Sequence, residues 1–273
     1  MARTPLVKLS LVGLLVLILI ALFGRYAAPY SPTALESVPY SPPSRHFLLG
    51  TDFLGRDVLS RVLYGGRSVL VVAGTATTLA YVFGLTIGLL SGFNRSWLDA
   101  TLMRTMDVLL AFPPILFILV LAAGAGAGAT MLIVGIAVVH VPSIARVVRA
   151  AALDVSVHGY VEAAVARGDA TRHILFREML PNISSPVAAD LGPRVTISIL
   201  LVAGVNFLGL GLAPPSPDWA IAVAENRSGL GIQVWAVLGP AAMIAALTFV
   251  TNVVADATAR SLGRNETREA TPL

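Results

Sequence analysis

Residues 160–182 read YVEAAVARGDATRHILFREMLPN, the stretch that says most about the fold. It contains three arginines, two glutamates and one aspartate, although only 12% of the whole chain is charged. Local rules predict two short helices, because residues 161–167 favour helix and Gly168 suits the left-handed position that ends one. Asp169 is then expected to cap the second helix and Pro181 to stop it.

The second predicted helix has an apolar side and a charged side. Its expected apolar ridge consists of Ile174, Leu175, Phe176 and Met179. Arg172 and Arg177 should remain in water. With small Ala163 and Ala164 on one surface, such a hairpin is suited to docking against another protein. A solvated loop that merely connects two membrane spans explains the same residues equally well from local physics alone.

The rest of the chain is strongly apolar. Of its 273 residues 56% are hydrophobic, and the mean hydropathy is +0.81, which indicates a membrane protein. The formal charge of +4 then reflects membrane orientation, and we expect no nucleic-acid partner. Cysteine is absent, which excludes disulfides and zinc–thiolate sites, and the four histidines are too dispersed to predict a metal site.

Six stretches are apolar and long enough to approach the roughly 20 residues that a spanning helix needs. They are residues 6–23, 69–93, 108–123, 130–145, 187–210 and 234–255. The first resembles a signal peptide because Arg3 and Lys8 precede its apolar part. We expect an uncleaved helix instead, because the apolar core is long and lacks a clear cleavage site. The prediction is an all-α membrane protein with six transmembrane helices.

The distribution of arginine and lysine predicts the orientation. With the N-terminus inside, twelve such residues lie inside: Arg3, Lys8, Arg95, Arg104, Arg146, Arg149, Arg167, Arg172, Arg177, Arg260, Arg264 and Arg268. Six lie outside: Arg25, Arg45, Arg56, Arg61, Arg67 and Arg227. This asymmetry predicts that both termini and residues 160–182 are cytoplasmic. Five of the outside arginines lie in one long loop, which weakens the asymmetry.

The chain lacks the groups that would power transport by itself. Predicted helices two, three, four and six contain no charged residue in their interiors, which disfavours an ion-coupled carrier. The only lysine is Lys8, so no P-loop is present and any ATP chemistry belongs to another subunit. Helix five carries Asp190 and Arg194 one turn apart. They form either a structural ion pair or, in the case of Arg194, part of a substrate path.

Residues 160–182 also carry a family resemblance. Glu162-Ala163-Ala164, Gly168 and the later Leu180-Pro181 resemble the EAA motif of permease subunits in binding-protein-dependent ABC importers. The resemblance implies a coupling helix seated in a groove of a separate ATPase subunit, with these six residues docking. Met179 stands where isoleucine is usual, which is a conservative departure.

Two further segments resemble the dipeptide, oligopeptide and nickel permease group within that family. Residues 49–61, LGTDFLGRDVLSR, are similar to the signature before the second helix. Residues 206–211, NFLGLG, and 214–219, PPSPDW, are similar to the end of helix five and the loop after it. Signature residues by this resemblance are Gly50, Asp52, Gly55, Arg56 and Asp57. Arg194 departs from the group, because a small or apolar residue is expected there.

The first of these segments has a physical interpretation of its own. Asp52 and Arg56, like Asp57 and Arg61, are spaced i, i+4, which predicts an interfacial helix. Such a helix would either brace helix two or receive an extracytoplasmic binding protein. The proline-rich residues 29–43 before it predict an extended connector.

Small residues predict two further contacts. Gly84 and Gly88 in helix two have the small-xxx-small spacing of closely packed membrane helices, and the glycines at 124–128 allow a tight turn.

Taken together, the resemblance implies a type I ABC importer permease fold in the bacterial inner membrane. The expected parts are residues 1–66 (first helix and external loop), 67–265 (five-helix core with coupling segment 150–182) and 266–273 (cytoplasmic tail). Expected partners are a second, homologous permease, two ATPase subunits that bind ATP and magnesium, and an extracytoplasmic binding protein. We expect no cofactor in this chain and import of di- or oligopeptides. The alternatives are nickel or another small solute, an ion-coupled carrier, and a membrane scaffold without transport.

Overall fold

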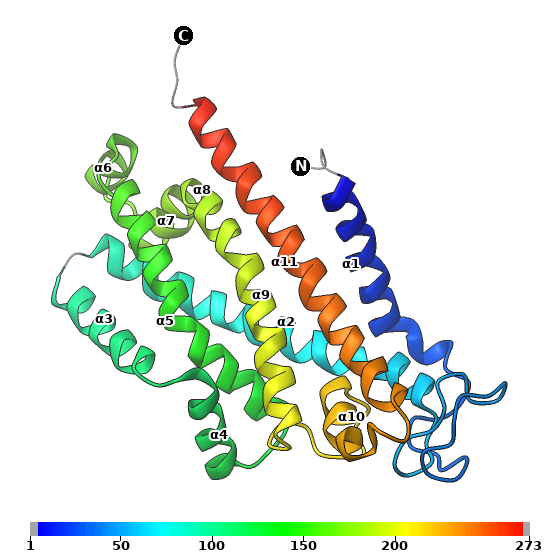
Figure 1. Ribbon diagram of the computed structural model, residues 1–273. Coiled ribbons are helices and arrows are strands. Elements are labelled where there is room, and N and C mark those ends of the chain that lie inside the picture. Colours follow the sequence, from blue (N-terminus) through cyan, green and yellow to red (C-terminus); the bar gives the residue numbers. More distant parts are fainter. Residues whose placement is uncertain (1–4, 95, 270–273) are drawn as a thin grey trace.

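The computed structural model describes residues 5–94 and 96–269, and its regular structure is helical (Figure 1). In chain order the elements are α1 (Pro5–Phe23), η1 (Gly24–Tyr26), α2 (Val58–Phe93), α3 (Trp97–Leu110), α4 (Pro114–Ala125), α5 (Ala129–Val155), α6 (Gly159–Ala166), α7 (Thr171–His173), the π-helical η2 (Ile174–Met179), α8 (Leu180–Asn182), α9 (Ser184–Phe207), α10 (Trp219–Asn226), η3 (Arg227–Gly229) and α11 (Trp235–Glu269). The described residues contain no strand, so the predicted all-α class is confirmed.

Five elements are long and apolar enough to cross a membrane: α1 with η1, α2, α5, α9 and α11. The predicted third span, residues 108–123, is wrong as one straight helix. It falls on the junction of α3 and α4, which are bent by 86°. Pro113 is extended there (φ −60°, ψ 129°), because a residue that precedes proline disfavours helix and Pro114 follows. Six spans are counted only if this bent pair is one span.

Several helices run beyond the predicted stretches. Helix α2 begins at Val58, so the expected boundary between residues 66 and 67 falls inside it. Helix α11 extends to Glu269, which makes the first part of the expected tail helical. Residues 270–273 lie outside the described residues, as do Arg3 and Arg95 of the orientation count.

Helix α5 is the central element of the bundle. In its most apolar window 61% of the residues are buried, compared with 22% in α1 and α11. Helix α2 packs closely on it through Gly84, Gly88 and Gly92, which lie on one side of α2. A Cβ atom added at Gly88 would lie 2.6 Å from the Cβ of Val148 on α5. The predicted close contact is therefore confirmed, and α2 and α5 form the central helix pair of the bundle.

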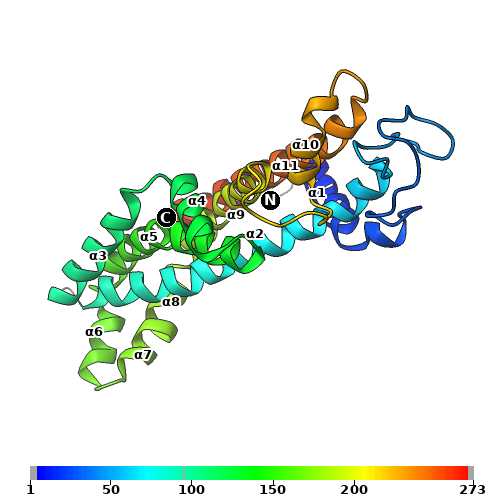
Figure 2. The same ribbon diagram turned by 90° about the horizontal axis from the view of Figure 1, so that it is seen from below.

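The molecule has two distinct ends. The start of α1, the end of α11 and residues 156–183 lie at one end, which we call the hairpin end (Figure 1). Residues 27–57 and α10 lie at the opposite end, which we call the loop end. Figure 2 shows α6 and α7 projecting from the bundle. The glycine turn at 124–128, with positive φ at Gly126 and Gly128, joins α4 to α5 as predicted.

Candidate functional site

Residues 156–183 form a helical hairpin between α5 and α9. Its two arms pack on each other through small and apolar side chains. The residues buried in this contact are Val161, Ala164, Ile174, Leu175 and Met179. They join a core cluster that includes Val148 and Ala152 of α5, so the hairpin is attached firmly to the central helix.

The turn between the arms is closed at Gly168, whose φ is +81°. Its N–H donates to the carbonyl oxygen of Val165 at 3.0 Å, and the N–H of Asp169 donates to that of Ala164 at 3.1 Å. This pair of bonds is the Schellman motif, and the expected left-handed glycine is confirmed. Nothing lies within 4 Å of where a Cβ would stand, so backbone strain alone restricts this position.

Three local predictions for the second arm are wrong. Asp169 does not cap it, because its carboxylate accepts from Arg167 at 2.8 Å and α7 has no side-chain cap. Pro181 does not stop it, because helix continues to Asn182; the wider π-helical turn at Ile174–Met179 lies immediately before the proline. Phe176 does not join the ridge, and half of its side chain is exposed.

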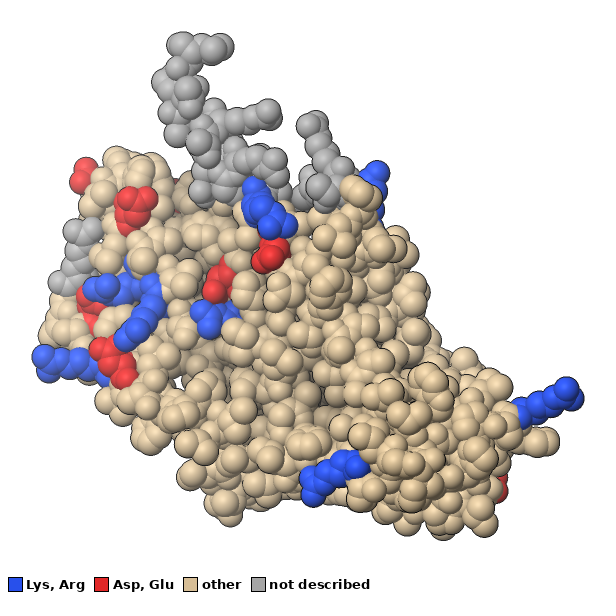
Figure 3. Space-filling view, in the orientation of Figure 1, with Lys and Arg blue, Asp and Glu red and all other residues tan. Residues whose placement is uncertain are grey.

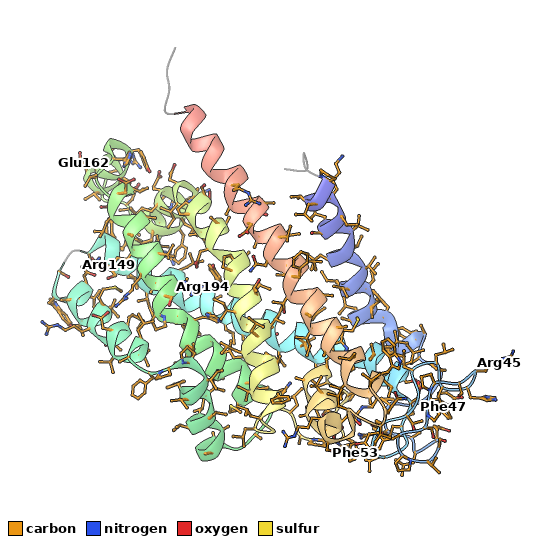
Figure 4. All side chains as sticks on the ribbon, in the orientation of Figure 1. Arg45, Phe47, Phe53, Arg149, Glu162 and Arg194 are labelled. Carbon is orange, nitrogen blue, oxygen red and sulfur yellow. The ribbon has the colours of Figure 1, made fainter. Side chains whose placement is uncertain are left out.

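The hairpin divides the six predicted docking residues into two sets. Glu162, Ala163, Gly168 and Pro181 are exposed, whereas Ala164 is buried and Leu180 packs partly against the hairpin core. Figure 4 shows Glu162 on α6 at the edge of the molecule. The exposed set is accessible to a partner, and the other two residues hold the shape of the hairpin.

At the loop end, four charged side chains form a buried network. Arg56 contacts Asp52 at 2.6 Å and Glu225 at 2.8 Å, and Arg61 contacts the same two carboxylates at 2.8 Å each. Asp52, Arg56 and Arg61 are almost completely buried. Burial raises the pKa of Glu225, and the charge of Arg56 opposes that rise. The network joins the signature loop to the first turn of α2 and to α10.

The expected interfacial helix does not form. The chain remains a loop up to Asp57, whose carboxylate accepts from the backbone N–H of Ser60 at 2.7 Å and caps α2. Asp57 therefore does not pair with Arg61 as predicted. Gly50 and Gly55 both have positive φ, and a Cβ at Gly55 would lie 1.9 Å from the carbonyl oxygen of Ser37. The two glycines allow the loop to fold back tightly on itself.

The second signature segment also contacts α2. Trp219 is fully buried, and its indole N–H donates to the carbonyl oxygen of Val62 at 2.7 Å. Asp218 caps α10 and accepts from Ser68 of α2 at 2.6 Å. Burial raises the pKa of Asp218. Both signature segments thus fix α10 against α2, which corresponds to bracing, the first of the two roles considered for the loop.

Arg194 lies on α9 within the bundle (Figure 4). Its guanidinium contacts the carboxylate of Asp190 at 3.1 Å, and Tyr81 of α2 donates to that carboxylate at 2.9 Å. One turn further along α9, Ser198 lies 3.0 Å from the ring of His140 on α5. The i, i+4 ion pair therefore forms and is tied to α2. Ser198 also lies 2.8 Å from the hydroxyl of Thr77 on α2, so hydrogen bonds at Ser198 link α2, α5 and α9.

A groove of about 710 Å³ lies between α9, α10 and α11. Leu200, Phe207, Ile244 and Phe249 line it, and none of its described lining residues is charged. This mostly apolar lining suits contact with another apolar surface within the membrane.

Two contacts and one exposed side chain were not predicted from the sequence. Glu225 completes the buried network, Tyr81 holds Asp190, and Phe176 adds an exposed aromatic surface to the hairpin. Glu225 was detectable only as a lone acid in a mostly apolar segment. The other two carry no sequence signal that separates them from ordinary core residues.

Comparison with known proteins identifies the class of molecule. Residues 84–265 match the family model described as binding-protein-dependent transport system inner membrane component. The dipeptide transport system permease protein DppC of Alkalihalophilus pseudofirmus is 33% identical, over 91% of this chain and 83% of that protein. The glutathione transport system permease protein GsiD of Pectobacterium atrosepticum is 34% identical, over 89% and 82%.

Solved structures add the fold. An inward-facing conformation of the MetNI methionine ABC transporter superposes with a TM-score of 0.59 at 18% identity, over 75% of this chain and 96% of that one. The predicted type I ABC importer permease fold is confirmed. This chain is a multi-pass permease component of an ABC importer in the bacterial inner membrane, and it belongs to the family of binding-protein-dependent transport system inner membrane components.

Proposed function

We propose that this chain moves di- or oligopeptides across the membrane, driven by ATP hydrolysis in separate subunits. The observation that carries the proposal is the projecting hairpin with exposed Glu162 and Ala163 at one end of the bundle. It has the shape and chemistry of a docking element. The chain itself has no P-loop lysine, so energy from ATP would enter through such a contact.

The proposed orientation places the hairpin end in the cytoplasm. The beginning of α1 and the end of α11 lie at that same end, so both termini would be cytoplasmic (Figure 1). The arginine asymmetry supports this assignment.

In the proposed mechanism, two ATPase subunits close on ATP and move the hairpin as a rigid lever. The hairpin core is continuous with α5, and α5 is packed tightly on α2. A displacement of α6 would therefore tilt the α2–α5 pair and switch the bundle between inward-facing and outward-facing states. A second, homologous permease would form the other wall of the path, and a binding protein would deliver substrate at the loop end.

The substrate class rests on the relatives. Their names give dipeptide, di- and tripeptide and glutathione transport, and all three substrates contain peptide or peptide-like amide bonds. Each relative is matched over more than four fifths of its length. We therefore assign short peptides to this chain.

The test is uptake by the complete complex, purified from its own host through a tag on this chain and reconstituted in liposomes. We expect peptide-stimulated ATP hydrolysis and ATP-dependent uptake of labelled di- and tripeptides. Mass spectrometry of the co-purified proteins should find one further permease, ATPase subunits and a binding protein.

Three other results would contradict parts of the proposal. Uptake of nickel without uptake of peptide would overturn the substrate class. Uptake by the chain alone under an ion gradient would make it an ion-coupled carrier. Hydrolysis of ATP by the chain free of other subunits would contradict the assignment of ATP hydrolysis to separate subunits.

A further inference from the structure

A second pocket lies at the loop end, beside the junction of α1 and α2. Its volume is about 390 Å³. Arg25, Tyr64 and Arg67 contribute polar groups to it, whereas Ala21, Val71 and Val72 contribute an apolar wall. The pocket therefore combines two cationic side chains with an apolar wall. The groove between α9 and α11 differs, because no charged residue among those the structure describes lines it.

Close packing of α1 on α2 defines the level at which this pocket lies along the bundle. A Cβ at Gly24 would lie 2.6 Å from the carbonyl oxygen of Leu63, and one at Gly66 would lie 2.7 Å from the Cβ of Ala21. The end of α1 is thus level with residues 63–67 of α2. The first apolar span ends at Tyr26, and a membrane boundary at that level would place both arginines where hydrocarbon meets headgroups.

The two arginines lack acidic partners. Within residues 5–94 and 96–260, neither Arg25 nor Arg67 forms an ion pair, in contrast to Arg56 and Arg61 nearby. Asp218 is joined to the pocket through Ser68, but it is buried and already accepts from Ser68 and from two backbone N–H groups. Arg25 also stacks on the ring of Tyr26. Arg67 is exposed.

We propose that this pocket binds the phosphate of an anionic phospholipid, with Arg25 and Arg67 as the phosphate ligands. Guanidinium groups bind phosphate oxygens in pairs of parallel hydrogen bonds. The apolar wall favours a lipid over free phosphate or an acidic protein surface. Val71 lines the pocket and is 49% exposed, so the pocket opens onto the apolar side of α2, where an acyl chain would lie.

The test is native mass spectrometry of the delipidated protein complex titrated with phosphatidylglycerol, phosphatidylethanolamine or inorganic phosphate. We expect preferential binding of phosphatidylglycerol, weakened about tenfold or more in the Arg25→Gln/Arg67→Gln variant. The matched control is Arg45→Gln/Arg227→Gln, which removes two exposed arginines from the same end and should bind as the wild type does. Equal binding by both double variants would overturn the proposal.

A second measurement keeps the proposal testable if the Arg25→Gln/Arg67→Gln variant is unstable. Wild-type complex is labelled with a photoreactive phosphatidylglycerol, and the modified peptides are mapped. We expect labelling of the segment that contains residues 63–72. Three outcomes would each contradict the lipid assignment. The first is labelling confined to other segments, and the second is saturable binding of inorganic phosphate that displaces no lipid label. The third is protection of the pocket only by the binding protein.

Discussion

The main charged cluster at each end of this molecule differs in its exposure to water. At the loop end, Asp52, Arg56, Arg61 and Glu225 form ion pairs with one another away from water, although other arginines there are exposed. At the hairpin end the charges are largely exposed; Arg167, for example, pairs with Asp169 while more than half of its side chain remains accessible. Figure 3 shows charged side chains gathered over α3, α5 and α6 and few over the middle of the molecule.

This contrast indicates a structural role for the buried charges and a partner-binding role for the exposed ones. Breaking a buried ion pair leaves an uncompensated charge and costs about 3 to 5 kcal/mol, whereas an exposed pair contributes about 1 kcal/mol or less. The loop end is thus built to keep α2, α10 and the signature loop in one arrangement. The hairpin end keeps its polar groups available to a partner, and substitutions there should affect transport more than stability.

The largest expected effect is at the loop end, in Arg61→Ala. Removing Arg61 takes one of two cations from a network of two carboxylates, so the remaining buried charge should destabilise the fold by about 3 to 5 kcal/mol. The measurement is unfolding of the purified chain in mixed micelles by titration with a denaturing detergent.

Arg45→Ala provides the matched control, because Arg45 is an exposed arginine in the same loop (Figure 4). It should change stability by no more than about 0.5 kcal/mol. Similar losses for the two variants would show that the network does not brace the loop end.

Sequence reasoning succeeded at the loop end only where the contact was local. The predicted pair of Asp52 and Arg56 forms, but in a loop and not along the helix that the i, i+4 rule assumed. The same rule failed for Asp57 and Arg61, because a carboxylate just before a helix gains more by capping its free N–H groups than by pairing along a helix that has not begun. Glu225 lies too far away in the sequence for any local rule to connect it.

At the hairpin end, Gly168→Val should have the next largest effect. A β-branched residue at φ +81° carries a strain of about 1 to 2 kcal/mol, which should misdirect the second arm while the apolar spans still insert. We expect loss of peptide uptake and of stimulated ATPase activity in the reconstituted complex, at normal protein level.

Gly168→Asn separates strain from side-chain size, because asparagine tolerates the left-handed region and the site has room for a side chain. It should keep most of the activity. Wild-type uptake by Gly168→Val would mean that the hairpin is only a connector between two spans.

Between the two ends, Arg194→Ala tests whether the ion pair on α9 holds the bundle or lines the substrate path. The pair is mostly but not completely buried, so its loss should cost about 1 to 3 kcal/mol, between the values for exposed and buried pairs. If Arg194 lines the path, uptake per assembled complex should fall clearly, whereas Tyr81→Phe, which removes only the hydrogen bond to Asp190, should leave uptake nearly unchanged. Equal losses in uptake and in assembled protein would assign Arg194 a structural role.

The hairpin illustrates what sequence can and cannot predict. Its two arms and the glycine turn follow from local propensity and were predicted. Local propensity does not predict which alanine of the motif is buried. Ala163 and Ala164 are chemically identical, and only the packing of the second arm distinguishes them. The bend between α3 and α4 was missed for a related reason: hydropathy alone does not register that two adjacent prolines interrupt an apolar run.

The smallest expected effect on stability comes from removing one exposed carboxylate at each end. This pair of substitutions is also the sharpest test of the contrast. Glu162 and Glu36 are both exposed glutamates, the first on the hairpin and the second in the loop. Replacing either by alanine should change stability by no more than about 0.5 kcal/mol, since neither forms a buried contact. If the hairpin is the ATPase-docking surface, Glu162→Ala should nevertheless lower stimulated ATPase activity and uptake in the reconstituted complex, and Glu36→Ala should not. Equal activities for the two variants would remove Glu162 from that surface, and a loss confined to Glu36→Ala would move the important contact to the loop end.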